Sequence, residues 1–167
     1  MSFKLKEQGY VLVVDQASNA AGVSLWYNGR LIATTVLESN SAKDPISRRL
    51  QDQIPQLDSF LAKHLPDAAR ITKIVFEGVR ARLVLVTVGA FLTCPRIHAK
   101  LSPKASFVES TSWKKWAREH GATEERLKDV KGVKALRETG FPVEEHGITS
   151  DDVADSVLMY LTWREVP

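Results

Sequence analysis

The strongest constraint on the fold is the pair Asn28-Gly29, which lies between two apolar runs. Asn and Gly both tolerate positive φ, and such a pair is typical of the tight turn in a β-hairpin. Residues 22–26 and 31–37 are then the two strands of the hairpin. The short β-branched run 10–14 comes before them and is typical of a strand buried on both faces. The three runs together predict an antiparallel meander at the start of the chain.

Helices and strands alternate after the meander. Asp44 and Pro45 predict an N-cap and first helical position, and apolar residues then recur at helical spacing, with Pro55 as a point where the helix kinks or restarts. The run 71–76 reads as a strand, and because it follows a crossover helix it should pair in parallel with an earlier strand. Residues 82–94 are expected to form a buried helix, and residues 105–109 a strand. A helix is expected to start at Trp113, with Thr111 or Ser112 as its cap, and another to lie within 123–139, interrupted at Gly132. The final helix is expected to run from a Thr149-Ser150 cap to Trp163.

The resulting order is β-β-β-α-β-α-β-α-α, an α/β arrangement. We expect residues 1–167 to form one domain, with a mixed five-stranded sheet that has three antiparallel strands followed by parallel ones and helices on both faces. No run of about 18 apolar residues is present, so no membrane span is expected. The first ten residues lack the pattern of a signal peptide, and the single cysteine, Cys94, excludes an internal disulfide. We therefore expect a cytoplasmic protein.

Charge is sorted along the chain, although the net charge is only +3. Residues 78–108 contain no acid, residues 111–137 contain eight Lys or Arg against four acids, and residues 138–163 contain six acids and no Lys or Arg. Basic stretches beside an acidic region suit a protein that binds a polyanion. The candidate DNA-contacting residues are Arg80, Arg82, Lys104, Lys114, Lys115, Lys128, Lys131 and Lys134.

Two details refine this set. Lys128, Lys131 and Lys134 recur at helical spacing, which predicts one basic face, and the intervening Gly132 suggests a flexible element that orders on DNA. Trp113 and Trp116 are three apart on a helix, a spacing that favours the core or a dimer interface over base stacking.

Four acidic residues carry the main hypothesis about function. Asp15 and Glu77 each end an apolar strand, so parallel pairing would bring them to one edge of the sheet. Asp152 and Asp155 are three apart at the start of an apparently amphipathic helix and therefore share a face. Each acid alone also has a structural interpretation, as a turn residue or, for Asp151 and Asp152, as a helix cap. The constellation is more specific than its members.

Clustered carboxylates suit hard divalent cations such as Mg²⁺. Two such ions about 4 Å apart can generate a nucleophile from water and stabilise the leaving oxyanion in phosphodiester hydrolysis. We therefore expect Asp15, Glu77, Asp152 and Asp155 to be both metal ligands and catalytic residues, with Asp151 as a cap or a supporting group.

The motifs resemble those of RuvC-type Holliday junction resolvases, in particular the phage branch. The segments 15–22 (DQASNAAG), 74–77 (IVFE) and 152–158 (DVADSVL) are similar to the three motifs of that family, in the same order. The resemblance implies a ribonuclease H-like fold, a homodimer, two Mg²⁺ or Mn²⁺ ions per site, and paired symmetric nicks across four-way DNA junctions in recombination and repair. The chain differs by having Gln16-Ala17 where the family often has Pro-Gly, and no aromatic wedge within 78–82.

Two other functions fit the same residues. One is a different ribonuclease H-like nuclease, acting on an RNA–DNA hybrid or on branched or flap DNA. The other is a binder of branched DNA without catalytic activity, although the presence of all four carboxylates argues against it.

Overall fold

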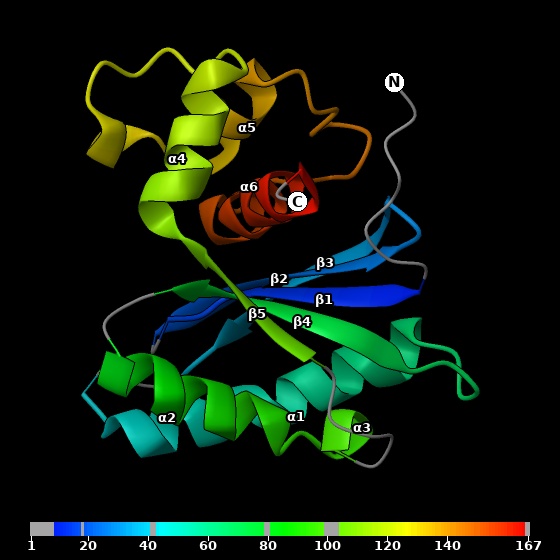
Figure 1. Ribbon diagram of the computed structural model, residues 1–167. Coiled ribbons are helices and arrows are strands. Elements are labelled where there is room, and N and C mark those ends of the chain that lie inside the picture. The colour runs from blue at the N-terminus through cyan, green and yellow to red at the C-terminus, as the bar shows by residue number, and fades with distance from the viewer. Residues whose placement is uncertain (1–8, 18, 41–42, 79–80, 99–103, 166–167) are drawn as a thin grey trace.

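A computed structural model describes residues 9–17, 19–40, 43–78, 81–98 and 104–165, with the backbone alone for 81–85 and 98. A five-stranded sheet lies in the middle, and helices cover both of its faces (Figure 1). The strand order is β3-β2-β1-β4-β5. The strands are β1 (Tyr10–Asp15), β2 (Ala20–Tyr27), β3 (Arg30–Glu38), β4 (Ile71–Gly78) and β5 (Lys104–Glu109).

The pairing of the strands confirms the predicted mixed sheet. β1, β2 and β3 form the antiparallel meander, and the β2–β3 turn has positive φ at Asn28 (47°) and Gly29 (83°). β4 pairs in parallel with β1, and β5 pairs in parallel with β4. The carboxyl ends of β1 and β4 therefore lie at the same edge of the sheet.

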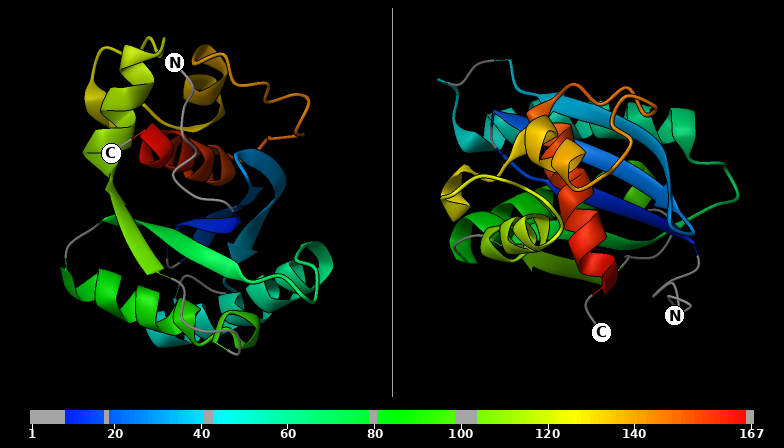
Figure 2. Two further views of the ribbon diagram at one scale, coloured as in Figure 1. Left: turned by 45° about the vertical axis from the view of Figure 1, so that its right-hand side comes forward. Right: turned by 90° about the horizontal axis from the view of Figure 1, so that it is seen from above.

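The helices form a layer on each side of the sheet (Figures 1 and 2). One layer contains α1 (Ile46–His64), α2 (Ala81–Leu92) and the short α3 (Pro95–His98). The other contains α4 (Ser110–Glu119), the 3₁₀ turn η1 (Leu127–Asp129), α5 (Gly132–Glu138) and α6 (Asp151–Glu165). No helix within the described ranges is both long enough and apolar enough to cross a membrane.

Alternation along the strands divides the core into two clusters. In β1, Val11 and Val13 belong to the cluster on the α6 side, and Leu12 and Val14 to the cluster on the α1 side. All four side chains are buried, as expected for a strand covered on both faces. The side of the sheet on which a residue lies therefore follows from its position along the strand.

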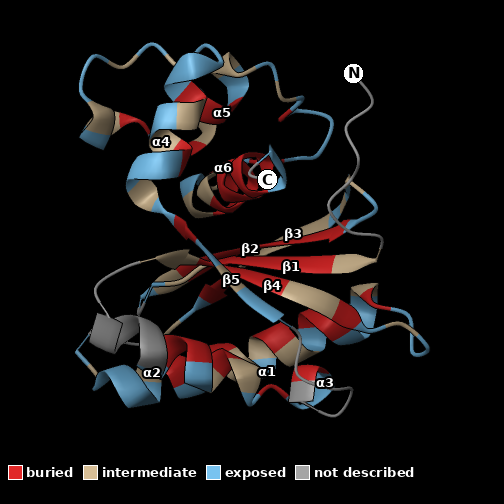
Figure 3. Cartoon of the chain, viewed as in Figure 1, coloured by how far each residue is buried: buried red, intermediate tan, exposed pale blue. Residues whose placement is uncertain are grey.

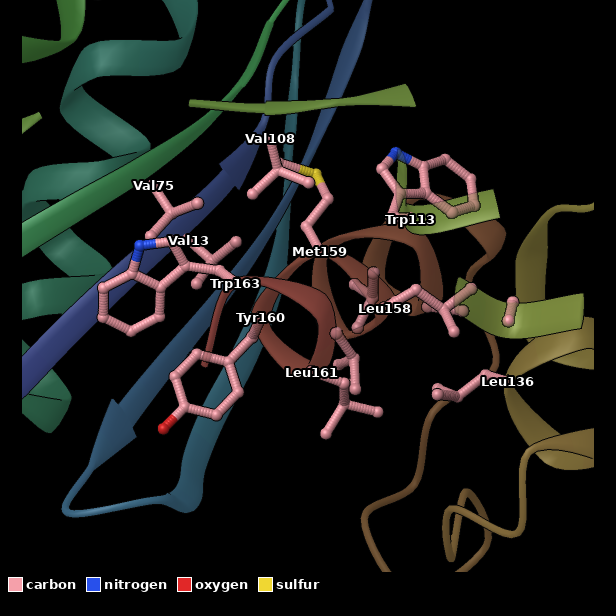
Figure 4. Close-up of a cluster of buried hydrophobic side chains, with 14 of the residues drawn as sticks. Val13, Val75, Val108, Trp113, Leu136, Leu158, Met159, Tyr160, Leu161 and Trp163 are labelled. Carbon is pink, nitrogen blue, oxygen red and sulfur yellow. The ribbon is translucent and has the colours of Figure 1, made fainter. Parts of the chain in front are cut away.

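α6 is not the amphipathic helix that the sequence suggested. Residues 153–163 are all buried except Asp155, which is half-buried (Figure 3). The reason is that α6 is the middle of a stack: the sheet packs on one side, and α4 and α5 pack on the other. Figure 4 shows Met159 and Trp163 of α6 beside Val108 and Val75 of the sheet.

Several helix starts differ from the prediction. α1 begins at Ile46 with Pro45 as N-cap, and it continues through Pro55 without a restart because its buried apolar side chains hold it against the sheet. α4 begins at Ser110, directly after β5, so Glu109 rather than Thr111 or Ser112 is the N-cap. The cap of α6 was predicted correctly, since Ser150 Oγ accepts a hydrogen bond from the backbone N–H of Val153 at 3.4 Å.

Candidate active site

Strand register brings Asp15 and Glu77 to one edge and one face of the sheet. Val13 pairs with Val75 in the parallel β1–β4 ladder, and both face α6. Side chains alternate along a strand, so Asp15 and Glu77, each two residues further on, also face α6. The predicted convergence of these two carboxylates is therefore present in the fold.

Gly22 allows α6 to begin beside them. Gly22 is the partner of Asp15 in the β1–β2 ladder. A Cβ atom built on Gly22 would lie 1.9 Å from the carbonyl oxygen of Asp152 and 2.7 Å from the nitrogen of Val153. The missing side chain lets the first turn of α6 lie directly on β2, and this places Asp152 and Asp155 next to Asp15.

The electrostatics of the four acids confirm that they are neighbours. Burial raises the pKa of Asp15 well above its usual value, and the charges of Glu77 and Asp155, a hydrogen bond with the Glu77 carboxyl group and the charge of Asp152 raise it further. The pKa of Asp155 is raised to about 7, because burial and the charges of Glu77, Asp151 and Asp152 outweigh the hydrogen bond from the Gly132 backbone, which lowers it. A group of carboxylates that repel one another in this way would be stabilised by a cation.

The donor set suits a hard cation, because all four candidate ligands offer carboxylate oxygens. The side chains do not yet converge on one point, however: within the described residues, no three Asp, Glu, His or Cys side chains are placed to hold a single ion. Metal binding at this cluster would therefore require the carboxylates to reorient. Burial and, to a smaller extent, the charge of Asp151 raise the pKa of Asp152, so Asp152 is also one of the carboxylates that repel one another.

Glu77 is held in place by two side chains whose role the sequence did not reveal. The side-chain amide of Gln16 donates from Nε2 to the carbonyl oxygen of Glu77 at 2.5 Å and accepts from the Glu77 backbone N–H at 2.9 Å. It thereby extends the β1–β4 ladder beyond the last backbone pair. The buried Trp113 donates from Nε1 to Oε2 of Glu77 at 3.3 Å. Trp113 lies in the core, which is one of the two settings, core or dimer interface, that its spacing favoured, and its indole N–H also orients the acid.

The first residues of α5 hold the acids of α6. The backbone N–H of Gly132 donates to Oδ1 of Asp155 at 2.6 Å, and the N–H of Val133 donates to Oδ1 of Asp151 at 2.9 Å. Gly132 has φ of +74°, and a Cβ atom there would lie 2.2 Å from Asp151 Oδ1. Gly132 is thus a fixed part of the acidic cluster rather than the flexible element suggested by the sequence. An isolated glycine between basic residues gave no signal of this contact.

The basic residues are only partly gathered at the site. Lys104 begins β5 and pairs with Lys73 of β4. Glu77 is four residues further along β4, so Lys104 lies toward the opposite end of the sheet from the acids. The predicted basic face of three lysines is wrong, because Lys128 lies in η1, Lys131 caps α5 and Lys134 lies within α5, where it pairs with Glu124 at 2.7 Å.

The remaining candidate cations differ in how they are held. Lys114 donates to the carbonyl oxygen of Lys128 at 3.2 Å and lies 5.4 Å from the ring centroid of Trp113, whereas Lys115 is exposed. Arg80 and the side chain of Arg82 lie outside the described residues.

Comparisons with known proteins agree on the fold. No protein-family model matches the chain, and no curated protein matches it by sequence. Thermus thermophilus RuvC matches with 17% identity and a TM-score of 0.57, covering 92% of each chain. The same protein in complex with a Holliday junction substrate matches with 15% identity and a TM-score of 0.55, covering 93% of this chain and 92% of that one. A Fowlpox virus resolvase solved with Holliday junction DNA has 11% identity, a TM-score of 0.48 and coverage of 93% and 97%. The chain has the ribonuclease H-like fold of RuvC.

Proposed function

We propose that the protein is a metal-dependent endonuclease that cuts four-way DNA junctions by paired symmetric nicks, acting as a homodimer. The observation that supports this most is that Asp15 and Glu77, at one edge of a RuvC-like sheet, lie beside Asp152 and Asp155 at the start of α6. Two RuvC structures of similar fold, one of them with a Holliday junction, make this branched substrate the first to test.

The four carboxylates are the proposed ligands for two Mg²⁺ or Mn²⁺ ions. When bound, such ions supply a nucleophile from water and stabilise the departing oxygen of the phosphodiester. The protein's own residues fix the positions of the ligands. Gln16 holds the backbone of Glu77, Trp113 orients its carboxylate, and the N–H of Gly132 holds Asp155. The proposed metal site is thus supported by hydrogen bonds from the residue that follows β1, from α4 and from the start of α5.

The Asp155 carboxyl group has a second property that bears on ion binding. Its pKa of about 7 means that it is partly protonated at neutral pH without metal. A cation must then displace a proton to use this ligand, so metal affinity should increase as the pH rises through 7.

A cleavage assay on three substrates tests the proposed function. A four-way junction, a linear duplex of the same sequence and an RNA–DNA hybrid are each incubated with the protein and Mg²⁺. The proposal predicts two symmetric nicks in the junction and none in the other two. Cleavage of the hybrid alone would instead indicate a different ribonuclease H-like nuclease, and binding of the junction without any cleavage would indicate a binding protein.

A further inference from the structure

A pocket lies at the far end of α6 from the acidic cluster. Its volume is about 320 Å³, and it opens between the β2–β3 turn, the loop before α6 and the last turns of α6. Arg30, His146 and Arg164 line it together with Phe141 and Leu31. Twelve residues of helix separate Asp152 from Arg164, which is about 18 Å at 1.5 Å per residue. The pocket and the carboxylates are therefore on the same face of the sheet but at different ends of one helix.

The base of this pocket is rigid. Trp26 is buried and stacks on Tyr160 of α6 with ring centroids 3.8 Å apart and planes 11° apart. Its Nε1 donates to Ser24 Oγ at 2.9 Å. Phe141 meets the edge of Trp26 at 6.4 Å, and the His146 ring stacks on Phe141 at 5.3 Å. The aromatic packing holds His146 at the rim of the pocket.

The cations at the rim are not neutralised by acids. Arg30 and Arg164 are exposed, and neither forms a salt bridge with a carboxylate in the part of the chain that the structure describes. Glu165, the acid next to Arg164 in sequence, is engaged elsewhere, because its Oε2 accepts from Trp116 Nε1 at 2.6 Å. By contrast, Arg126 and Arg137 are paired with acids at 2.7 and 2.8 Å. The guanidinium groups of the pocket are available to an anion.

We propose that this pocket binds a backbone phosphate, with its deoxyribose, on an arm of the DNA substrate away from the cut. Two guanidinium groups match the oxygens of a phosphate, and the apolar side chains of Phe141 and Leu31 offer a surface to the sugar. A separation of about 18 Å from the acids is about half of the roughly 34 Å turn of B-DNA. A duplex arm that reaches both places would span about half a turn. This inference rests on the proposed function, since it takes DNA as the substrate.

A salt series of binding measurements tests the proposal. A fluorescently labelled four-way junction is titrated with protein in EDTA, and anisotropy gives the affinity between 50 and 300 mM NaCl. The test variant carries Arg30→Gln and Arg164→Gln. The matched control carries Arg48→Gln and Arg70→Gln, which remove the same charge from exposed positions outside this pocket. Melting curves of both variants show whether they fold like the wild type.

The slope of log affinity against log salt falls by about 0.9 for each phosphate contact that is lost. The pocket variant is expected to lose about 0.9 of the slope, which corresponds to one phosphate contact, and to bind the junction about tenfold more weakly in about 100 mM NaCl, while the control retains the wild-type slope. A pocket variant with wild-type slope and affinity would overturn this inference alone, provided that the wild type binds the junction. A wild type that does not bind the junction would overturn the proposed function as well.

Discussion

Replacing Gly22 with alanine should displace the start of α6 from the acidic cluster. The added Cβ would lie 1.9 Å from the Asp152 carbonyl oxygen, whereas an ordinary contact begins at 3.4 Å. The backbone of α6 must therefore retreat by about 1.5 Å, since no flexible side chain is available to yield. Overpacking of this kind typically costs about 1–3 kcal/mol of stability. A displacement of about 1 Å in a catalytic group can reduce the rate by about 10²-fold.

The assay is single-turnover cleavage of a four-way junction in Mg²⁺, together with thermal unfolding of the same preparations. Gly89→Ala is the matched control, because a Cβ at Gly89, in α2, meets nothing within 4 Å. We expect the Gly22 variant to unfold at a lower temperature and to cleave about 100-fold more slowly, and the Gly89 variant to do neither. If Gly22→Ala retained the wild-type rate and stability, the close approach of α6 to β2 would not be what positions Asp152 and Asp155.

Two further substitutions address the environment of the acids. Trp113→Phe removes the indole N–H that donates to Glu77 and should slow junction cleavage about tenfold, the equivalent of about 1.4 kcal/mol. Trp116→Phe on the same helix should not slow cleavage, because the Trp116 N–H donates to Glu165 instead. Equal rates for the two variants would exclude the positioning role of Trp113. Because the pKa of Asp155 is raised, the folded protein without metal keeps a proton on this carboxyl group that the unfolded chain releases above pH 3.8. The free energy of unfolding therefore decreases as the pH rises from about 4 to about 7. Asp155→Asn should therefore be more stable than wild type at pH 8 and nearly equal to it at pH 4 in metal-free thermal unfolding; a difference that is the same at both pH values would contradict the burial of a charge at Asp155.

The sheet could be predicted from the sequence because its turn and its strands are each specified by residues that are neighbours in the chain. Asn28-Gly29 sets the β2–β3 turn through its positive φ, and the apolar runs on either side set the strands. The position of Asp15 and Glu77 at one edge of the sheet followed from the rule that a strand after a crossover helix pairs in parallel. These rules require no knowledge of what packs on the sheet.

Features that depend on contacts between distant segments were missed. α6 was expected to be amphipathic because Asp152 and Asp155 share one face, but its polar residues Ser156 and Thr162 are buried and hydrogen-bond to backbone carbonyls within the helix. The spacing of the lysines at 128, 131 and 134 suggested one helix, but the positive φ of Gly132 separates η1 from α5. Gln16 gave no signal either, because its amide pairs with a strand 61 residues away.

The most direct test of the account compares wild type with Asp15→Asn on a four-way junction. Asn is nearly isosteric with Asp but removes one negative charge from the cluster, so it should prevent metal-dependent cleavage without affecting the phosphate contacts. We predict that Mg²⁺ or Mn²⁺ supports paired nicking by the wild type only, and that both proteins bind the junction with the same affinity in EDTA. Cleavage by the Asn variant at the wild-type rate would contradict the assignment of the acidic cluster as the active site.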